Sequence, residues 1–412
     1  MTLRELIQKY DVPGAQVAVL NDGEIHDEAA GVLSLHTQVE TTPDSVFKIG
    51  SITKIWTATL VNQLVEEKKL DLDEPITNHL PGFQLSDREA TDTITPRHLL
   101  THTSGIAPNH FTDTGRSDDA LEKFIATLRT EEHLLEPGTL FSYSNTGFAL
   151  LGRLVEVVRG KRFHDVLREH LITPLGLKAV ATDPYEAILH RTAVGHLDTG
   201  PTKSWAVSYR TAPSGSHFAT SARDLLTFVH HHLTDPALAA LREPQLTEIP
   251  EFGDGIRGYG LAWMIYGHGH LGHTGISKGQ KAFLRVIPDE NLAVAVLTNS
   301  VNGEPLAREV FAAHGIDMHE PPAPPHNPAP IDDWMHGTYR NPLFDITLDA
   351  EHLTYRPRTG FAESLRKPRA EVVRHSERTI ITSSNEVMSL IGSDEHGRAK
   401  YLHNGAAAYR IA

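Results

Sequence analysis

Residues 47–56 constrain this chain more than any other stretch, because a glycine break there leads directly into an apolar helical pattern. Gly50 tolerates backbone angles that other residues avoid, so it suits a sharp entry into a helix. Apolar residues then recur near the helical period as far as Val65, which predicts an amphipathic to fully buried helix. We expect Ser51 at the N-terminus of this helix, with Lys54 on the same face one turn later.

The Ser-x-x-Lys spacing is one that nucleophilic catalysis can use. A serine hydroxyl is a poor nucleophile until a neighbouring base takes its proton. Lys54 can be that base if burial or nearby positive charge lowers its pKa, and an apolar helix provides burial. The free N–H groups at a helix N-terminus also help to hold an oxyanion. Because the same spacing occurs by chance in many helices, this interpretation depends on further motifs.

The composition excludes several classes of function. The chain has 412 residues, enough for two or three domains with a large core. A net charge of -14, without a long basic run, argues against nucleic acid and anionic membrane surfaces as partners. The absence of cysteine excludes disulfides, thiolate metal sites and a cysteine nucleophile. No apolar run has the length of a membrane span.

Residues 1–10 predict an amphipathic helix and lack the continuous apolar segment of a signal peptide. We therefore expect a cytoplasmic protein, with a processed secreted form as the alternative. The oligomeric state is left open.

The order of strands and helices places a mainly helical middle between two regions that mix both. Residues 13–20 and 24–32 predict a hairpin around Asn21-Asp22-Gly23, a strong turn signal. Further strands are predicted at 259–266, 280–287 and 292–297, and helices at 96–100, 118–128, 148–158, 221–232 and 305–313. Tyr143 and Asn145 are expected in a loop before the helix at 148–158.

A Pro-rich stretch at 321–330 predicts a stiff extended linker, and hence a domain boundary. We therefore divide the chain into a first domain at 1–318, a linker at 319–330 and a small all-β domain at 331–412. Short alternating runs in the last part predict an antiparallel barrel or sandwich. These runs are 344–348, 352–356, 380–383, 387–390, 400–403 and 408–411.

Three motifs follow one another in a specific order: Ser51-x-x-Lys54, Tyr143-Ser144-Asn145 and His273-Thr274-Gly275. This order resembles the serine β-lactamase and penicillin-binding protein superfamily, whose motifs are S-x-x-K, Y-x-N and a K-T-G-like strand. Within it the chain is similar to the class C-like branch, which includes DD-peptidases, D-aminopeptidases, esterases and acyltransferases. Residues 99–105 are also similar to a stretch common in that branch, and the resemblance covers about residues 1–315.

The resemblance implies an α+β fold of the β-lactamase/transpeptidase type. An antiparallel sheet flanked by the terminal helices would lie beside a helical subdomain, with the active site between them. The C-terminal part would be a small antiparallel β-barrel-like domain, lipocalin-like as in some relatives, whose loops shape or cover the pocket.

The resemblance also implies roles for individual residues. Ser51 would be the acylated nucleophile and Lys54 its proton partner. Tyr143 would shuttle protons, which requires that cations such as Lys54 lower its pKa. Asn145 would hold the substrate's acyl-side amide. The oxyanion hole would consist of the backbone N–H groups of Ser51 and Ile276.

The third motif departs from the family pattern at His273, where many members have lysine. Thr274 and Gly275 follow the pattern and would belong to the substrate-binding strand. Histidine is mostly neutral near pH 7 unless a partner raises its pKa. Recognition of a penicillin carboxylate and efficient β-lactamase activity are therefore less expected than in lysine-containing relatives. Histidine occurs here in esterase- and peptidase-like relatives, so His273 is kept as a catalytic candidate.

Two other patterns compete with this interpretation. Residues 275–279 match G-x-S-x-G, but that nucleophile elbow needs a helix after it, and 282–287 predicts a strand. His268, His270 and His273 have metal-like spacing, yet residues 267–288 contain no carboxylate to complete a zinc site. We therefore expect neither a metal nor a cofactor.

These residues predict acyl transfer through a Ser51 acyl-enzyme on a peptide, amide or ester, with a small molecule or peptide as substrate. Water as acceptor would make the protein a serine hydrolase. An amine acceptor would instead make it a transacylase or a non-ribosomal peptide cyclase of the penicillin-binding-protein-type thioesterase kind. A non-catalytic ligand-binding homologue is a further alternative. Whether β-lactams are hydrolysed or only bound stays open.

Overall fold

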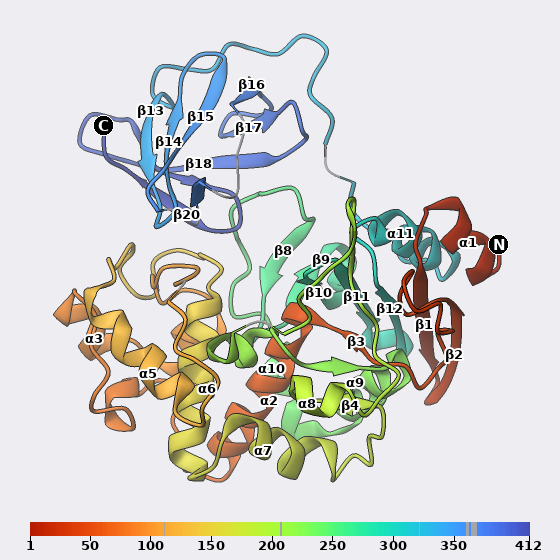
Figure 1. The fold of residues 1–412 in the computed structure, drawn as a ribbon. Coiled ribbons are helices and arrows are strands. Elements are labelled where there is room, and N and C mark those ends of the chain that lie inside the picture. The colour runs from red at the N-terminus through yellow and green to blue at the C-terminus, as the bar shows by residue number, and fades with distance from the viewer. Residues whose placement is uncertain (111, 207, 321, 360–361, 364–368) are drawn as a thin grey trace.

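The structure is a computed structural model of the chain, and it describes residues 1–110, 112–206, 208–320, 322–359, 362–363 and 369–412. It consists of a large part that combines a sheet with helices and a barrel that lies above it in Figure 1. This confirms the predicted α+β fold with a C-terminal antiparallel barrel.

The large part is built on a seven-stranded sheet in the order β2-β1-β12-β11-β10-β9-β8. All neighbouring strands in it are antiparallel. The strands are β1 (Gly14–Asn21), β2 (Glu24–Gly31), β8 (Ile256–Tyr259), β9 (Met264–Tyr266), β10 (Leu271–Ser277), β11 (Gln280–Ile287) and β12 (Leu292–Thr298). The β1–β2 hairpin turns at Asp22 and Gly23, both with positive φ, as the Asn-Asp-Gly signal predicts. The predicted strand at 259–266 is wrong in one respect, because the chain reverses within it and forms the ends of β8 and β9.

Helices cover both faces of this sheet. On one face α1 (Leu3–Lys9) and α11 (Gly303–Ala313) share an apolar cluster with the sheet, and they lie side by side in Figure 1. On the other face α9 (Ala222–Thr234) packs on β1 and β12, and α2 (Thr53–Glu66) lies beneath it. Trp56 of α2 stacks on Phe228 of α9, with ring centroids 3.7 Å apart. The core between α2, α9 and the sheet therefore holds the helix that follows Ser51.

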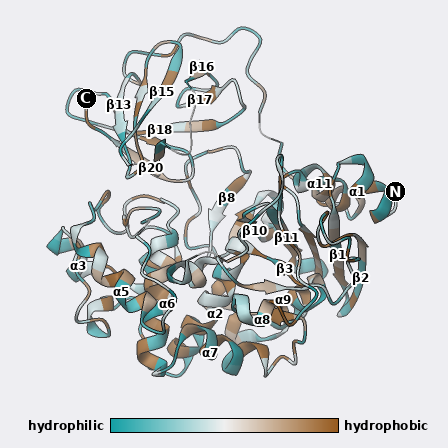
Figure 2. Ribbon diagram, viewed as in Figure 1, coloured by the Kyte–Doolittle hydropathy of each residue, from teal (hydrophilic) through white to brown (hydrophobic). Residues whose placement is uncertain are grey.

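A helical region lies beside the sheet, where α6 packs against α2, α4 and α5. Figure 2 shows hydrophobic residues along the central helix α6 and hydrophilic ones along the peripheral helix α3. The helices of this region are α3 (Arg88–Thr93), α4 (Pro96–Leu100), α5 (Ala120–Thr127), α6 (Asn145–Arg159) and α7 (Phe163–Leu167). Two short helices, α8 (Pro184–Ala187) and α10 (Ala239–Arg242), lie nearer to the sheet. Two small sheets complete this part, formed by β3 (Phe47–Lys48), β4 (Val180–Ala181) and β7 (Ala219–Thr220), and by β5 (His196–Leu197) and β6 (Gly200–Pro201).

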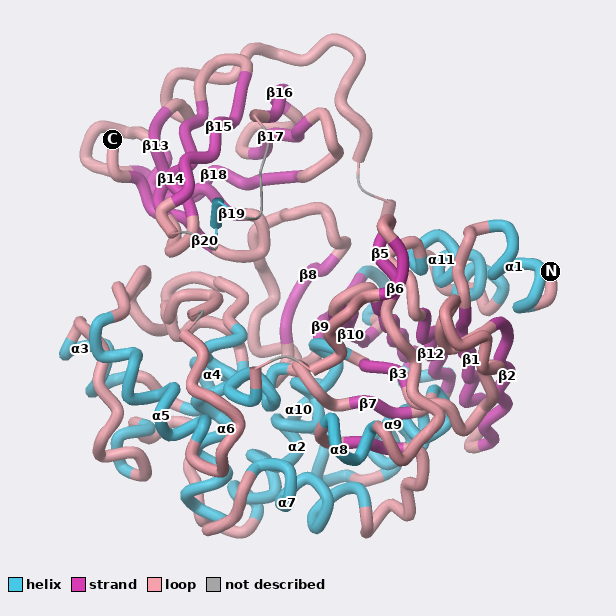
Figure 3. Tube along the Cα trace, in the orientation of Figure 1, coloured by secondary structure: helices cyan, strands magenta, loops and turns pink. Residues whose placement is uncertain are grey.

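The C-terminal part is a closed barrel in which β13 to β20 follow one another in sequence order. Its strands are β13 (Gly337–Arg340), β14 (Phe344–Leu348), β15 (His352–Pro357), β16 (Ala370–Arg374), β17 (Thr379–Thr382), β18 (Val387–Ser393), β19 (Ala399–His403) and β20 (Ala407–Arg410). Strands β13 and β16 were not predicted, because their charged and polar residues obscure the alternation of buried and exposed positions. Residues 322–336 connect α11 to the barrel without a helix or strand (Figure 3). None of the helices in the described part of the chain is long and apolar enough to cross a membrane.

Candidate active site

Ser51 and Lys54 lie where the predicted helix begins. Gly50 has a φ of +51° and opens a short 3-10 turn at Gly50–Ile52, which continues into α2. The Lys54 Nζ lies 3.1 Å from the Ser51 Oγ, 2.7 Å from the Asn145 Oδ1 and 3.1 Å from the backbone oxygen of Ser214. The local geometry predicted from the Ser-x-x-Lys spacing is therefore confirmed.

Lys54 is fully buried, and burial lowers the pKa of its amine well below the usual range. A neutral amine has two N–H donors and one lone pair. The donors match the two oxygens of Asn145 and Ser214, which leaves the lone pair for the Ser51 hydroxyl proton. This arrangement meets the condition for a lysine general base.

The Tyr143 segment approaches the same amine from the helical region. Ser144 caps α6 by accepting a hydrogen bond from the Gly147 N–H. Asn145 is thus the first residue of α6, which corrects its expected place in the loop, because the cap starts the helix earlier than the apolar pattern does. The Lys54 Nζ lies 4.7 Å from the centroid of the Tyr143 ring. The Tyr143 side chain also hydrogen-bonds Ser51.

Burial raises the pKa of Tyr143 above its usual value, although the hydrogen bond with Ser51 opposes this shift. The expectation that Lys54 lowers the pKa of Tyr143 is therefore wrong for the resting site. Its physical reason is that the amine shares the same buried environment and favours its neutral form. Tyr143 thus holds its proton while Lys54 is free to accept one.

His102 supports the Tyr143 segment, although no role was predicted for it from the sequence. Its Nδ1 accepts a hydrogen bond from the Ser144 N–H at 2.9 Å, so the proton of the neutral ring lies on Nε2, 3.1 Å from the Tyr259 hydroxyl. Its ring centroid is 4.3 Å from that of Tyr143. Burial lowers the pKa of His102, which keeps the ring neutral and Nδ1 an acceptor. The one feature of the sequence that pointed to His102 was the similarity of residues 99–105 to the family.

The barrel supports the same segment from above. The backbone N–H of Tyr143 donates to the Gly405 oxygen at 2.9 Å, and the Ala407 N–H donates to the Ser142 Oγ at 3.1 Å. The Nε2 of the buried His403 lies 2.8 Å from the backbone oxygen of Phe141. The hairpin between β19 and β20 therefore binds three consecutive residues up to Tyr143. No sequence signal connected these segments.

Strand β10 forms the wall opposite Tyr143. It pairs with β9 only at Leu271 and Gly272, so its edge beyond them is not covered by another strand of the described chain. That edge packs tightly on the turn before Ser51. A Cβ added to Gly275 would lie 1.8 Å from the Ile49 oxygen, and one added to Gly50 would lie 2.6 Å from the Ile276 nitrogen. The structure thus brings the backbone of Ile276 beside that of the Ser51 turn, as an oxyanion hole requires.

His273 is fully buried on β10, with its Nδ1 2.8 Å from the Thr274 oxygen. Because a carbonyl only accepts, the proton lies on Nδ1 and leaves Nε2 with a lone pair, and Nε2 has no partner among the described residues. Burial, with Lys54 as the next cause, lowers the pKa of His273 to about 3. His273 therefore supplies a neutral acceptor near Tyr143, whose ring centroid is 6.3 Å away, and not the fixed positive charge of a lysine.

Ser51 and Tyr143 open into a cavity of about 570 Å³ between the two parts of the molecule. Thr274 and Ile276 also line it, and the Ile276 side chain is 68% exposed. The barrel contributes six of the lining residues, at 385–387 and 404–406. This supports the expectation that the C-terminal part shapes the pocket.

Asn109 lines this cavity, whereas Asn145 does not. The Asn145 side chain is occupied on both sides, since its Oδ1 accepts from Lys54 and its Nδ2 donates to the Asn109 Oδ1 at 2.8 Å. Asn145 therefore holds Lys54 and Asn109 in place, and Asn109 is the amide available to a ligand. The sequence offered no signal for Asn109, because it lies in an irregular loop without a motif.

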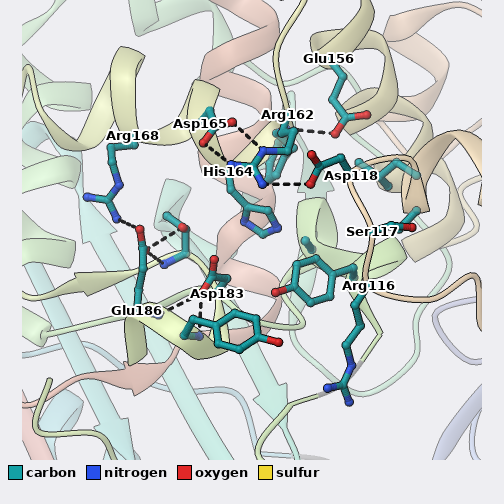
Figure 4. Close-up of a pocket in the computed structure, with 17 residues that line it drawn as sticks. Arg116, Ser117, Asp118, Glu156, Arg162, His164, Asp165, Arg168, Asp183 and Glu186 are labelled. Atoms are coloured by element: carbon teal, nitrogen blue, oxygen red, sulfur yellow. Dashed lines mark hydrogen bonds and ion pairs between the residues drawn. The ribbon is translucent and has the colours of Figure 1, made fainter. Parts of the chain in front are cut away.

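A smaller cavity of about 210 Å³ lies between α5, α6, α7 and α8 (Figure 4), and it shares no lining residue with the cavity at Ser51. Its charged side chains largely neutralise one another: Arg162 pairs with Asp118 and Asp165, and Arg168 pairs with Glu186. Asp183 caps α8. We therefore interpret this cavity as a polar interface that joins the helices, and not as a binding site.

The two competing patterns have structural explanations. Ser277 ends β10 and the chain returns at once into β11, so the G-x-S-x-G stretch forms a hairpin turn and not a strand–helix elbow. Among the residues that the structure describes, no group of three or more histidine or carboxylate side chains is placed to hold a metal ion.

Comparison with known proteins agrees with this geometry. A family model described as Beta-lactamase matches residues 2–315. Penicillin-binding protein 4 of Amycolatopsis lactamdurans is 39% identical over 349 residues, which are 79% of this chain and 92% of that protein.

Solved structures extend the likeness to the barrel. The crystal structure of SurE has a TM-score of 0.83 and 29% sequence identity, and covers 99% of this chain and 97% of its own. SurE has also been solved with D-Leu, with a TM-score of 0.82. The octameric penicillin-binding protein homologue from Pyrococcus abyssi shares the fold at a TM-score of 0.67 and 22% identity, over 97% of this chain and 93% of its own.

The family model covers most of the chain and includes Ser51, Lys54, Tyr143 and His273. Since the structure also gathers these residues around one cavity, sequence and geometry lead to the same conclusion: this chain belongs to the beta-lactamase family, and it is a serine hydrolase or acyltransferase of the kind found in penicillin-binding proteins and beta-lactamases.

Proposed function

We propose that this protein is a serine acyl hydrolase that acts on peptide-like amides or esters through a Ser51 acyl-enzyme. The observation that carries the proposal is the buried Lys54 amine 3.1 Å from the Ser51 Oγ, with its other hydrogen-bond directions taken by Asn145 and Ser214. An amine held in this way can accept only the serine proton.

In the acylation step the Ser51 Oγ forms a bond to the substrate carbonyl carbon, and its proton moves to the Lys54 Nζ. The backbone N–H groups of Ser51 and Ile276 stabilise the oxyanion. The bond to the leaving group breaks as Tyr143 gives that group its phenolic proton. The resulting phenolate lies beside the new Lys54 ammonium, so the two charges compensate each other in a buried site.

Deacylation reverses these proton movements. The Tyr143 phenolate takes a proton from the acceptor, which attacks the acyl carbon, and the Lys54 ammonium returns its proton to the Ser51 Oγ as the ester bond breaks. Atoms and charges are then restored to the resting state. The same sequence serves water or an amine as acceptor.

An amine acceptor is the second candidate, which would make the protein a transacylase or a peptide cyclase. One observation on the cavity lining favours this candidate, and one comparison bears on the configuration of the substrate. The cavity lining includes the exposed apolar side chain of Ile276, beside the Ser51 turn, and elsewhere Phe141 and Val387, and these apolar groups disfavour bulk water. The SurE structure, which matches both parts of this chain, binds D-Leu, and this supports a D-configured residue in the substrate.

The proposal is tested with a fluorophosphonate probe followed by mass spectrometry of the intact protein. We expect one adduct, located on Ser51, and none in the Ser51→Ala variant. A protein that forms no adduct but binds peptides would be the ligand-binding homologue. Peptidyl thioesters with D- or L-leucine at the C-terminus then separate the acceptors, because linear acids indicate water and cyclic peptides indicate the substrate's own amine.

A further inference from the structure

The cavity contains a second polar region away from Ser51, centred on Arg285 of β11. Arg285 is only 4% exposed, and its guanidinium lies 3.7 Å from the centroid of the Tyr266 ring. One of its N–H groups donates to the Leu284 oxygen at 2.9 Å. It forms no ion pair with any other residue in the described part of the chain, although it lines the cavity. Its remaining N–H donors are therefore available to a ligand.

A buried guanidinium without an anionic partner is unusual, because arginine stays charged and burial of an unpaired charge is unfavourable. Packing on Tyr266 holds the planar group in one orientation, as carboxylate recognition requires. Glu304, in the same cavity, shows the contrast with the unpaired Arg285. Glu304 also lines it, yet its carboxylate already pairs with Lys281 and Arg308, at 3.3 Å and 3.4 Å.

Asp254 provides the complementary charge at this end of the cavity. Its side chain is exposed to the cavity and forms no ion pair within the described chain. Asp254 and Arg285 influence each other electrostatically without touching. Two unpaired opposite charges that face one space suit a ligand group with an acceptor on one side and a donor on the other.

The strand register places this region relative to the nucleophile. Arg285 lies opposite Gly272 on β10, and Ile276, beside the Ser51 turn, is four positions further along. At about 3.4 Å per residue this separation is roughly 14 Å along the strand. Tyr266 connects the two regions, since its side chain hydrogen-bonds Thr274. A peptide with its reacting carbonyl at Ser51 would need about four extended residues to reach Arg285.

We propose that Arg285 and Asp254 form an anchoring subsite for a peptide residue that carries a carboxylate with an N–H group beside it. Arg285 donates to the carboxylate, and Asp254 accepts from the N–H. A C-terminal residue and an acidic side chain next to a backbone amide both offer this chemistry. The inference rests on the proposed function and names the substrate feature that the same cavity selects.

The test measures how well peptides protect Ser51 from the fluorophosphonate, with each rate divided by the rate of the same variant without peptide. The probes are N-acetylated alanine peptides of two to six residues, in L and D forms, as free acids and as amides. We expect the free acids of about four residues to protect at concentrations at least tenfold lower than the amides. Peptide amides with one glutamate, compared with glutamine, distinguish a side-chain carboxylate from a terminal one.

Single substitutions show whether Arg285 causes this preference for free acids and whether Asp254 recognises the N–H group. Arg285→Met should remove the preference for acids, while Arg285→Lys should keep a part of it. Arg257→Met is the matched control, because Arg257 is exposed on β8 outside the cavity lining, and should keep the whole preference. Asp254→Ala, which has no side-chain acceptor, should remove the preference for a peptide over a depsipeptide whose last N–H is replaced by oxygen.

Equal protection by acids and amides in the unaltered protein would overturn the proposal, and so would a preference that persists in a folded Arg285→Met variant. If Ser51 is not labelled at all, the proposed function fails, and calorimetry with the same peptides still tests the subsite. Melting temperatures establish that each variant is folded. Because methionine replaces an unpaired charge by an apolar group of similar length, Arg285→Met is expected to melt no lower than the unaltered protein.

Discussion

Ser51 and Lys54 lie on one short segment of chain, whereas Tyr143 and Asn145 are held by contacts from distant segments. The first pair needs only the glycine turn and one turn of a buried helix. The second depends on His102 from one side and on the barrel hairpin from the other. The proposed nucleophile and base are thus local features of the sequence, while the position of the proposed proton donor is a property of the whole fold.

The largest effect should come from the local pair. Lys54→Met removes the proton acceptor for Ser51, so we expect labelling and turnover to fall by about 10²–10⁴-fold. Lys48→Met is a suitable control, because Lys48 is also buried but contacts Trp205 and not Ser51. Rates measured with the fluorophosphonate and with an ester substrate check the prediction. Full activity of Lys54→Met would show that another group takes the serine proton.

A second comparison concerns His102. His102→Asn keeps an acceptor near the position of Nδ1, whereas His102→Gln places its polar group near Nε2 and leaves the Ser144 N–H without a partner. Since a displacement of about 1 Å can lower a rate by about 10²-fold, His102→Gln should lose about that much in kcat and His102→Asn much less. Similar rates for both variants would mean that His102 does not position Tyr143.

A smaller effect is expected at the barrel. His403→Gln keeps a donor for the Phe141 oxygen, and His403→Asn does not. The loss of one buried hydrogen bond costs about 1–3 kcal/mol of stability, so His403→Asn should melt earlier and lower kcat by about tenfold. His396→Asn, on the exposed turn between β18 and β19, serves as control. If both His403 variants match the control in kcat, the barrel does not influence the chemistry.

The last effect leaves kcat aside and concerns only the dependence of stability on pH. Burial lowers the pKa of His403 from 6.5 to about 4, so the unfolded chain binds more protons than the native state between these values. The contribution to stability is therefore complete above pH 6.5 and is lost as the pH falls towards 4. His403→Gln should reduce the slope of the unfolding free energy in this range by up to about 1.4 kcal/mol per pH unit. Denaturant unfolding at a series of pH values measures it, and an unchanged slope would contradict the assignment.

The sequence could predict what depends on short-range patterns. The Asn21-Asp22-Gly23 hairpin, the helix after Gly50, the helix predicted at 221–232 and the antiparallel strands around His273 all follow from local periodicity and turn chemistry. The class of fold followed from the order of the motifs.

The remaining features depend on pairings between distant residues, which a single sequence does not contain. Asn109 and His403 carry no motif, and their importance comes only from what the fold places beside them. The raised pKa of Tyr143 depends on burial within the assembled cavity, and the expectation of a lowered value considered only the nearest cation. Both shortcomings concern the helical region and the barrel, not the segment around Ser51.

The hairpin that holds residues 141–143 has a consequence for how the enzyme is made. The bond between His403 and Phe141 spans 262 positions of sequence, so it cannot form on the ribosome until almost all of the intervening chain has emerged. A nascent chain is therefore expected to carry its nucleophile and base long before its proton donor is fixed. We therefore expect full catalytic competence to appear late in synthesis, once the barrel has closed on residues 141–143.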